Sequence, residues 1–464
     1  MKVPRFPRLF FTLRLPTLLA MFWGAHVARQ KVAGAPRKAR MSFIVFRLDA
    51  LGDVVLTRPL FRALKSAYPG SHCTVVVQKA YKSLLATNPH IDEILAVPAI
   101  RPACLPQRLQ RLLGAVALYW SELRHRHFDY AISPRWDVDE HFATLLCIMT
   151  NAGARVGYSE RTTTAKQKMN RGFDRAFDIC LPSGPVRHEV LRNLAVGEAL
   201  GAKSCDGRLE IHVTDSDRKR AGRLLTQVSP KDGRTLRQAQ GRPWGTVQSA
   251  EFVALGIGAQ SPGRRWPLKG YAEVIRQLDR MRRVWPVIVC SASELGDALK
   301  LAAMLPREPV IVSGAGLREV CAMLERCELF IGNDSGCAHL AAAMDCPTLV
   351  ISRHPRNGDP NHFNSPVRFA PHGRQVRVLQ PAAGVDTCVK ACGSPDPHCI
   401  LAVSVDEVVA AALQMLTASL PAAVDPWPPK QRNFIAPALL NSHSVDALQA
   451  ASEALHATST RPLA

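Results

Sequence analysis

The chain has 464 residues, of which 47% are hydrophobic and 21% are charged. This length exceeds what one hydrophobic core usually supports and indicates two or three domains. The net charge is +21, of which +9 lies in residues 1–40, so an anionic partner is expected. The basic residues after position 40 are dispersed and lack the interleaved aromatic residues that stack on bases. We therefore do not expect a nucleic acid partner.

Residues 1–40 form a basic leader with an apolar stretch at 9–25. Arg14 and Pro16 interrupt this stretch, so the uninterrupted part is too short to span a bilayer. No small-residue cleavage site follows, which argues against a signal peptide. The leader is either an interfacial anchor that gives peripheral membrane contact or an unstructured extension.

Most of the thirteen cysteines stand singly in apolar runs, as Cys147 and Cys290 do. Such cysteines behave as small buried hydrophobic side chains and are typical of a reducing compartment. Together with the basic leader, this pattern favours a cytoplasmic protein at the inner face of the cytoplasmic membrane.

The first half of the chain alternates short apolar runs with helical patterns. Helices are expected at 56–67, 79–89 and 140–149 from the spacing of apolar residues. Strands alternating with helices indicate a parallel sheet covered on both faces. The expected strands are 42–47, 72–78, 91–98, 128–133 and 154–158.

The second half repeats this organisation after a polar, Gly- and Pro-punctuated linker or insertion at 229–245. Helices are expected near 271–284, from 294, at 317–327 and from 336. The chain is thus predicted to be α/β, with two doubly wound Rossmann-like domains, 41–228 and 246–416, facing a central cleft. An Ala/Pro-rich tail, 417–464, follows them. The expected strands are 252–259, 286–292, 310–314, 329–335 and 347–352.

In open α/β sheets, ligands bind at the carboxyl ends of the strands. Four strand-to-helix corners here carry unusual numbers of polar residues. At the first corner, Gly52 permits a tight turn and Asp53 stands near a helix start. Asp53 is either an N-cap or a general base.

The second corner follows the strand at 252–259 and contains Gln260, Ser261, Arg264 and Arg265. Backbone N–H groups at a helix start, together with arginines, make an anion site. The segment lacks the G-K-[ST] ending of a Walker A loop. It is either a phosphate-binding loop or a solvated basic turn.

The third and fourth corners carry acidic residues. Glu294 either accepts a ribose hydroxyl or is an ordinary first-turn helix acid. The stretch Asp334-Ser335-Gly336, with His339 one turn later, opens a helix. Gly336 suggests that something approaches the backbone closely. In the simpler interpretation, Asp334 caps the helix and His339 is a packed core histidine.

Two further motifs suggest metal binding. Asp137 and Asp139 form a D-x-D pair, which either holds Mg²⁺ with a diphosphate or caps a helix and contacts substrate. Capping or substrate contact is the favoured interpretation. Cys388, Cys392 and Cys399 stand near His398 and could bind zinc. Their C-x₃-C-x₆-C spacing is not that of a standard zinc knuckle, so we expect no metal site.

The order and spacing of these corners resemble the ADP-heptose:lipopolysaccharide heptosyltransferases, glycosyltransferase family 9. The resemblance covers about residues 41–416, and the C-terminal cysteine cluster also resembles this family. It rests on FIVFRLDALGDVVLTRPLFRALKSAYPG, GARVGY, HEVLRNLAVGEALG, GAQSPGRRWPLKGYAEVI and FIGNDSGCAHLAAAMDCPTLVI.

The resemblance implies a GT-B fold, an inverting and metal-independent transfer of heptose, and no cofactor. It implies an ADP-heptose donor and a lipopolysaccharide core or related anionic glycolipid acceptor. Asp53 matches the family's proposed catalytic base, and Gly52 and Arg135 are expected on the acceptor side. Arg264 stands where the family usually has a lysine, which keeps the charge but changes the geometry. Donor binding is expected from Gln260, Ser261, Arg264, Arg265, Glu294, Asp334, Ser335, Gly336 and His339.

Three alternatives remain open from the sequence. The donor is another nucleotide sugar, the protein is a non-catalytic nucleotide- or glycan-binding protein, or it is a membrane adaptor that acts through its leader. The intact Asp53, Asp334 and His339 argue against the non-catalytic alternative.

Overall fold

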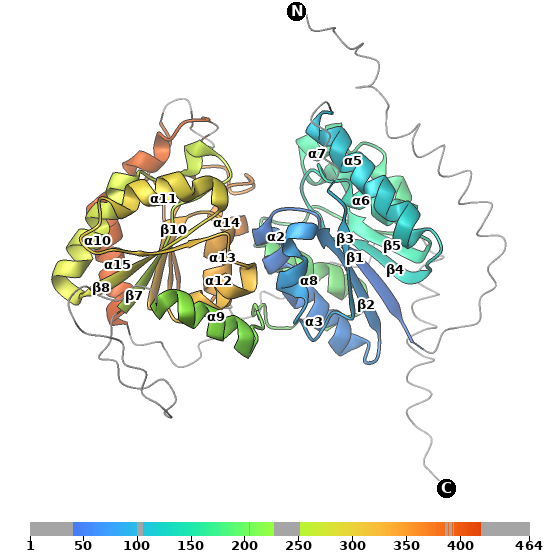
Figure 1. Cartoon of the computed structure of the whole chain (residues 1–464). Helices are drawn as coiled ribbons and strands as arrows, with labels where there is room; N and C mark the ends of the chain where they lie inside the picture. Colours follow the sequence, from blue (N-terminus) through green and yellow to red (C-terminus); the bar gives the residue numbers. More distant parts are fainter. Residues whose placement is uncertain are drawn as a thin grey trace, which may run out of the picture.

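The computed structural model describes residues 40–99, 105–203, 205–226, 251–385, 388, 392 and 394–418. The leader, the linker at 229–245 and the tail after residue 418 lie outside the described residues. Two α/β domains stand side by side (Figure 1). Each is built on a six-stranded parallel sheet.

The first sheet has the strand order β3-β2-β1-β4-β5-β6. Its central strand β1 is buried almost throughout, because a parallel strand covered on both faces must be apolar along its whole length. The strands are β1 (Ser42–Phe46), β2 (His72–Gln78), β3 (Glu93–Val97), β4 (Phe128–Ser133), β5 (Ala152–Tyr158) and β6 (Ile179–Leu181). The helices are α2 (Leu51–Leu56), α3 (Arg58–Ala67), α4 (Lys82–Leu85), α5 (Gln107–Leu118), α6 (Ala143–Met149), α7 (Thr164–Met169) and α8 (Glu189–Ala199).

The second sheet has the order β12-β11-β10-β7-β8-β9, which is the same topology repeated. Its strands are β7 (Glu251–Gly256), β8 (Val284–Cys290), β9 (Val310–Ser313), β10 (Leu329–Asn333), β11 (Thr348–Ile351) and β12 (Val376–Leu379). The helices that accompany it are α9 (Asp215–Thr226), α10 (Leu268–Arg282), α11 (Leu295–Ala302), α12 (Leu317–Leu324), α13 (Gly336–Ala343), α14 (Pro366–Phe369) and α15 (Val405–Thr417).

The predicted α/β class and paired Rossmann-like domains are confirmed. The helix expected at 56–67 differs in detail, because α2 ends at Leu56 and α3 begins at Arg58, with Thr57 between them. Pro59 explains the break. It has no N–H to donate and its ring would clash with the carbonyl four residues earlier, so one helix cannot run through it.

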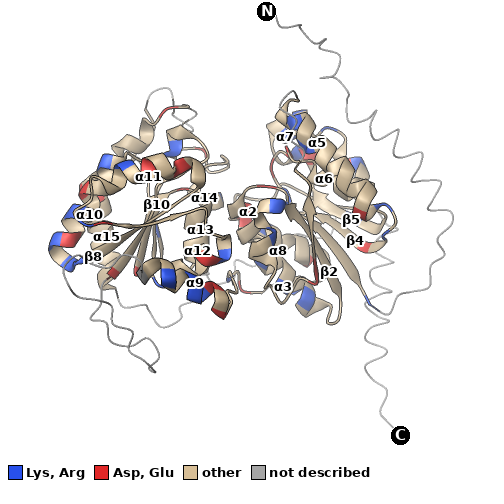
Figure 2. Cartoon of the chain, viewed as in Figure 1, with Lys and Arg blue, Asp and Glu red and all other residues tan. Residues whose placement is uncertain are grey.

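Helix α9 joins the second domain, although it precedes the expected boundary at residue 228. It packs against α12 through ion pairs from Arg218 to Glu325 (2.8 Å) and from Arg318 to Asp217 (3.2 Å). Figure 2 shows acidic and basic segments close together on these helices. We propose that the division between the domains lies between α8 and α9.

An apolar cluster extends across both domains. It includes Val55 and Leu56 of α2 together with Ala338 and Leu340 of α13. Since α2 and α13 each follow a central strand of their own sheet, this contact brings the two sets of strand-to-helix loops together (Figure 1). No helix of the described ranges is long and apolar enough to cross a membrane.

Candidate active site

The polar strand-to-helix corners lie at equivalent positions of the two sheets. In the first sheet β1 and β4 are neighbours, and their helices leave in opposite directions. In the second sheet β7 and β10 occupy the same positions. The carboxyl ends of such a strand pair form the crevice in which doubly wound folds bind their ligands.

A buried pair of carboxylates follows β1. Asp53 Oδ1 accepts hydrogen bonds from Arg47 Nη2 (3.1 Å) and Arg135 Nη1 (3.3 Å). Asp49 lies beside it, with Oδ2 at 3.4 Å from Arg47 Nη1 and Oδ1 at 3.4 Å from Arg135 Nε. His141 Nδ1 is 4.0 Å from Asp49 Oδ1. Two arginines therefore bridge two carboxylates.

The two carboxylates differ in their acid–base behaviour. Burial raises the pKa of Asp53, and the charges of Asp49 and Glu189 add to that effect, while Arg47 and Arg135 oppose it. Burial acts in the same direction on Asp49, but the nearby Arg135 and Arg47 outweigh it and hold the pKa of Asp49 below its usual value. Asp53 is thus the better proton acceptor of the pair.

Asp53 is not an N-cap, so that interpretation is wrong. The N-cap of α2 is Ala50, which makes no side-chain capping bond, and Asp53 lies in the first turn. Among the described residues, Oδ2 of Asp53 has no hydrogen-bond partner and its side chain is 11% exposed. One carboxylate oxygen is held by two arginines and the other is available.

Lys166 binds the backbone of the loop that carries Arg135. Its Nζ donates to the backbone carbonyls of Arg135 (2.8 Å), Trp136 (3.3 Å) and Tyr158 (3.0 Å). Burial lowers the pKa of Lys166 to about 8. The amine fixes the loop after β4 and therefore the position of Arg135. The sequence did not single out Lys166, because it stands in an ordinary helical segment.

On the second domain, Arg264 and Asp334 form a salt bridge. Arg264 Nη2 donates to Asp334 Oδ2 (2.6 Å) and to the Asp334 carbonyl (2.7 Å). Within the described ranges, the buried Nε of Arg264 has no hydrogen-bond partner. Asp334 does not cap α13, because the N-cap is Ser335, so the capping interpretation is wrong. Asp334 instead holds one side of a guanidinium.

Arg265 and Glu294 lie on the neighbouring loops. Arg265 Nε and Nη2 donate to the Ala259 carbonyl at 3.3 and 3.2 Å, and Nη2 lies 3.7 Å from Glu294 Oε1. Glu294 also accepts hydrogen bonds from the N–H (2.9 Å) and hydroxyl (2.8 Å) of Ser291. This capping box confirms Glu294 as a first-turn helix acid. Its role toward ribose stays a prediction.

Gln260 and Ser261 precede the 3₁₀ turn Pro262–Arg264. Gln260 is exposed and Ser261 is partly exposed. Ser261 is the N-cap of that turn and makes no side-chain capping bond. Both side chains therefore stand on the outer side of the loop that carries Arg264.

The two glycines at the helix starts are explained by contact between the domains. A Cβ on Gly52 would lie 2.7 Å from Cδ2 and 2.8 Å from Nε2 of His339. A Cβ on Gly336 would lie 2.8 Å from Cδ2 of Leu51. The close approach expected at Gly336 is thus confirmed, and the group that approaches is Leu51 of the first domain. Contacts of either glycine with substrate stay predictions.

His339 is a packed histidine, as the simpler interpretation held. Its side chain is 5% exposed, and burial lowers its pKa to about 4, so the imidazole is neutral at physiological pH. Among the described residues its Nδ1 has no hydrogen-bond partner. The ring spaces α13 from α2 at the domain interface.

The D-x-D residues have protein partners. Asp139 accepts backbone N–H bonds from His141 (3.0 Å), Ala143 (3.2 Å) and Thr144 (2.6 Å) at the start of α6. Asp137 Oδ2 accepts from Arg368 Nη1 at 3.1 Å. The capping interpretation is confirmed for Asp139.

Arg368 is an interdomain residue that the sequence analysis missed. This fully buried side chain of α14 reaches Glu189 of α8 (2.9 Å) as well as Asp137 of the first domain. Its guanidinium carbon lies 4.4 Å from the centre of the Trp136 ring. No sequence signal marks it, because all these partners are far away along the chain.

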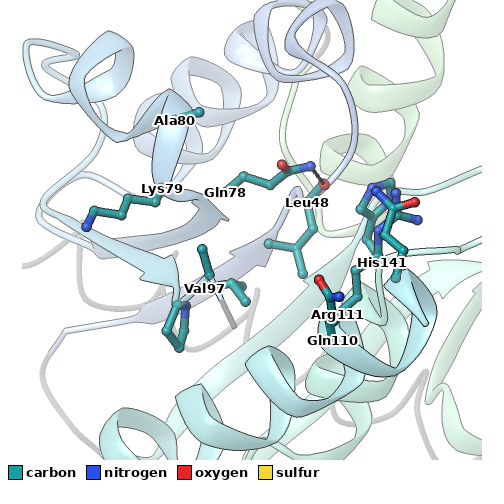
Figure 3. A pocket seen from close by; sticks show the side chains of 11 residues that line it. Leu48, Gln78, Lys79, Ala80, Val97, Gln110, Arg111 and His141 are labelled. Atoms are coloured by element: carbon teal, nitrogen blue, oxygen red, sulfur yellow. Dashed lines mark hydrogen bonds between the residues drawn. The ribbon is translucent and has the colours of Figure 1, made fainter. Parts of the chain in front are cut away.

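A pocket of about 230 Å³ opens on the first domain beside this site (Figure 3). Gln78 donates to the Leu48 carbonyl (2.6 Å) on one side, and Arg111 and His141 stand on the other. Leu48 precedes Asp49 in the chain, and His141 approaches Asp49 directly, so the pocket borders the carboxylate pair. The lining residues are Leu48, Gln78, Lys79, Ala80, Val97, Pro98, Ala99, Gln107, Gln110, Arg111 and His141.

Two Rossmann-like domains that meet at their strand ends, with a buried carboxylate on one and a basic loop on the other, are the architecture of GT-B glycosyltransferases. The chain belongs to glycosyltransferase family 9 (heptosyltransferase), whose family model matches residues 117–354. The resemblance inferred from the sequence is thereby confirmed.

Named relatives agree with this assignment. The lipopolysaccharide core heptosyltransferase OpsX of Haemophilus influenzae is 22% identical over 348 residues, 74% of this chain and 85% of that protein. The glycosyl transferase family 9 structure from Veillonella parvula has a TM-score of 0.61 at 20% identity, covering 82% of this chain and 99% of that one. The Escherichia coli ADP-heptose lipopolysaccharide heptosyltransferase II structure has a TM-score of 0.57 at 17% identity, covering 81% and 98%. The two structures show the fold.

Proposed function

We propose that this glycosyltransferase moves heptose from ADP-heptose to a lipopolysaccharide core or related surface glycan, with inversion and without a metal ion. The observation that carries the proposal is the placement of Asp53 and of the Arg264–Asp334 pair on facing corners of the two domains. Two of the relatives named above are lipopolysaccharide heptosyltransferases by name, and the name of one of these two includes ADP-heptose.

Asp53 is the proposed general base. Its unpartnered Oδ2 takes the proton of the acceptor hydroxyl while that oxygen attacks the anomeric carbon. The new C–O bond forms as the bond to the donor diphosphate breaks, and the diphosphate leaves with the electron pair. Attack from the side opposite the leaving group inverts the configuration. The raised pKa of Asp53 strengthens it as a base.

The second domain holds the donor. Arg264 is fixed through Nη2 by Asp334, and its guanidinium supplies positive charge for a donor phosphate. Arg265 adds positive charge on the same loop, and Gln260 and Ser261 line its outer side. The N-terminus of α13 at Ser335 and Gly336 favours negative charge. These fixed charges stabilise the departing diphosphate.

The first domain takes the acceptor. The pocket beside Asp49 carries Lys79, Arg111 and His141, which suits an anionic glycolipid head group. Arg135, between this pocket and Asp53, orients the base. The acceptor hydroxyl therefore enters from the first domain and meets the donor at Asp53.

Calorimetric titration with ADP, UDP and GDP tests the donor. Selective ADP binding that weakens in Arg264→Ala, but not in Arg276→Ala on α10, supports the proposal. Preference for UDP or GDP keeps the fold and replaces the donor. If folded protein binds none of the three, the chain is a non-catalytic member of its family.

Transfer assays test the chemistry. Asp53→Asn is expected to lose about 10²–10⁴-fold in kcat while its ADP affinity stays unchanged. Activity should not depend on added Mg²⁺ or Mn²⁺, and NMR of the product should show the inverted anomeric configuration. A retained configuration, or full activity of Asp53→Asn, contradicts the mechanism.

The enzyme is proposed to act at the inner face of the cytoplasmic membrane, because its acceptor is an anionic glycolipid and its leader is basic. Co-sedimentation with phosphatidylglycerol vesicles, with and without residues 1–39, tests this peripheral contact. Binding that persists without the leader would contradict its role as the anchor.

A further inference from the structure

Three cysteines and a histidine meet beside the donor loop, between β12 and α15. His398 Nε2 lies 3.5 Å from Cys388 Sγ and 3.3 Å from Cys392 Sγ, and His398 Nδ1 lies 3.2 Å from Cys399 Sγ. The four residues each offer a ligand atom, all within 4.8 Å of one another. The spacing of the cysteines led us to expect no metal here, but the fold brings the four groups together independently of that spacing.

We propose that Cys388, Cys392, His398 and Cys399 bind one divalent transition-metal ion in a tetrahedral Cys₃His site, with zinc as the preferred metal. Bond lengths of about 2.3 Å to sulfur and 2.0–2.1 Å to nitrogen at the tetrahedral angle put sulfur and nitrogen ligands roughly 3.6 Å apart. Two of the three observed S···N separations, 3.3 and 3.5 Å through Nε2, are close to this value. Nε2 is therefore the ligating nitrogen.

The chemistry of the donor set fits the same ion. Thiolates and imidazole select Zn²⁺ or iron over Mg²⁺ and Ca²⁺, which prefer oxygen. The three cysteines are 5%, 1% and 0% exposed. Four protein ligands that close a tetrahedron leave no position for water or substrate, so the site is structural and not catalytic.

The segment between these ligands reaches the donor loop. Arg353 Nη1 donates to the Ser394 carbonyl (2.9 Å), which lies between Cys392 and His398 in the chain. A Cβ on Gly263 would lie 2.8 Å from that Nη1 and 3.1 Å from the Pro395 carbonyl. Gly263 directly precedes Arg264, so the metal-bound segment supports the loop that places the Arg264 guanidinium.

The metal therefore stabilises the loop that carries Gly263 and Arg264, which we call the donor loop. The metal site stands without the proposed function. Only the effect on nucleotide binding rests on that function, through the role given to Arg264.

Metal analysis of the purified full chain, prepared without chelator, tests the site. About one equivalent of zinc or iron per chain is expected for a single site, and the analysis itself distinguishes the two metals. Cys392→Ser and Cys399→Ser should lose it. Cys290→Ser, at the end of β8, is the matched control and should keep it. His398→Cys should retain metal, because a Cys₄ set also binds zinc.

Cobalt provides a second readout that does not depend on activity. Protein reconstituted with Co²⁺ should show the visible absorption of tetrahedral cobalt thiolate, and Cys392→Ser should lose it. Folded protein with no bound metal and no cobalt spectrum would overturn the proposal, as would a disulfide between any two of the three cysteines found by mass spectrometry under reducing preparation.

Metal removal tests whether the metal stabilises the donor loop. Removal of the metal should lower the Tm and weaken ADP binding by at least about fivefold, a typical coupling between two sites. If the protein binds metal but its ADP affinity is unchanged after metal removal, the metal site exists and its proposed effect on the donor loop is contradicted. Metal-loaded protein that never binds ADP contradicts the proposed function instead.

Discussion

Replacing Arg135 with glutamine should move the acidic limb of the pH–rate profile to higher pH. Arg135 Nη1 lies 3.3 Å from Asp53 Oδ1, and this cation is one of the two that favour the ionised base. Without it, burial and the charge of Asp49 raise the pKa of Asp53 further. A general base works only when deprotonated, so activity at low pH is lost first.

The size of the shift follows from the geometry. Two unit charges about 3.3 Å apart interact by about 5 kcal/mol at an effective dielectric constant of about 20. This Coulomb energy is an upper limit, because it leaves out the cost of taking Arg135 out of water. A neighbouring cation usually shifts a carboxylate by about 1–3 units, and we expect a limb displaced upward by that amount.

The assay is kcat/KM for heptose transfer against pH, in wild type, Arg135→Gln and Asp53→Asn. Wild type should rise with unit slope to a plateau, Arg135→Gln should reach its plateau at higher pH, and Asp53→Asn should lack this limb. Arg155→Gln is the matched control, because Arg155 is a buried arginine of β5 that pairs with Asp178 (3.8 Å) away from the site.

An acidic limb that stays in place in Arg135→Gln, or moves to lower pH, would refute the reasoning. A limb that persists in Asp53→Asn would assign the titration to another group. Thermal unfolding of each variant across the same pH range separates these outcomes from loss of fold.

Four further predictions concern stability and the domain interface. The lowered pKa of Asp49 means that its ionised form stabilises the fold above its unfolded pKa, with that stability lost as the pH falls through the lower folded pKa, so Asp49→Asn should cost about 1–3 kcal/mol at pH 7. The raised pKa of Asp53 has the opposite sign, and Asp53→Asn should unfold at the same or a higher temperature than wild type at pH 7; a lower temperature contradicts this. Gly52→Ala should reduce kcat/KM by about 10²-fold because the interface must shift, whereas Gly296→Ala, whose added Cβ meets nothing within 4 Å, should leave the kinetics unchanged. Arg368→Met should cost about 3 kcal/mol in chemical unfolding, because it leaves buried carboxylates uncompensated, and an unchanged midpoint would refute the interdomain role.

The α/β class and most of the strands could be predicted from the amino-acid sequence. Parallel strands covered on both faces must be apolar throughout, so runs such as β1 and β10 are visible without any tertiary information. The sequence also indicated the loops that carry Asp53 and Arg264 as candidate binding loops, because loops after central strands of a doubly wound sheet lie at its binding crevice. The roles of the two residues came from the resemblance to glycosyltransferase family 9 and stay predictions.

The tertiary structure decided what those residues touch. It placed Gly52 against His339 and Leu51 against Gly336, and it joined Arg368 to Glu189 across the domains. These partners are separated by long stretches of chain, and spacing along a sequence reports only neighbours within one element.

The C-terminal cysteines show the same limit. The C-x₃-C-x₆-C spacing led us to expect no metal site, yet the folded chain brings Cys388, Cys392 and Cys399 within reach of His398. The tertiary fold sets those distances, and no periodicity in the sequence describes them. Periodic burial can be predicted from the sequence, whereas contacts made by loops and between domains require the folded structure.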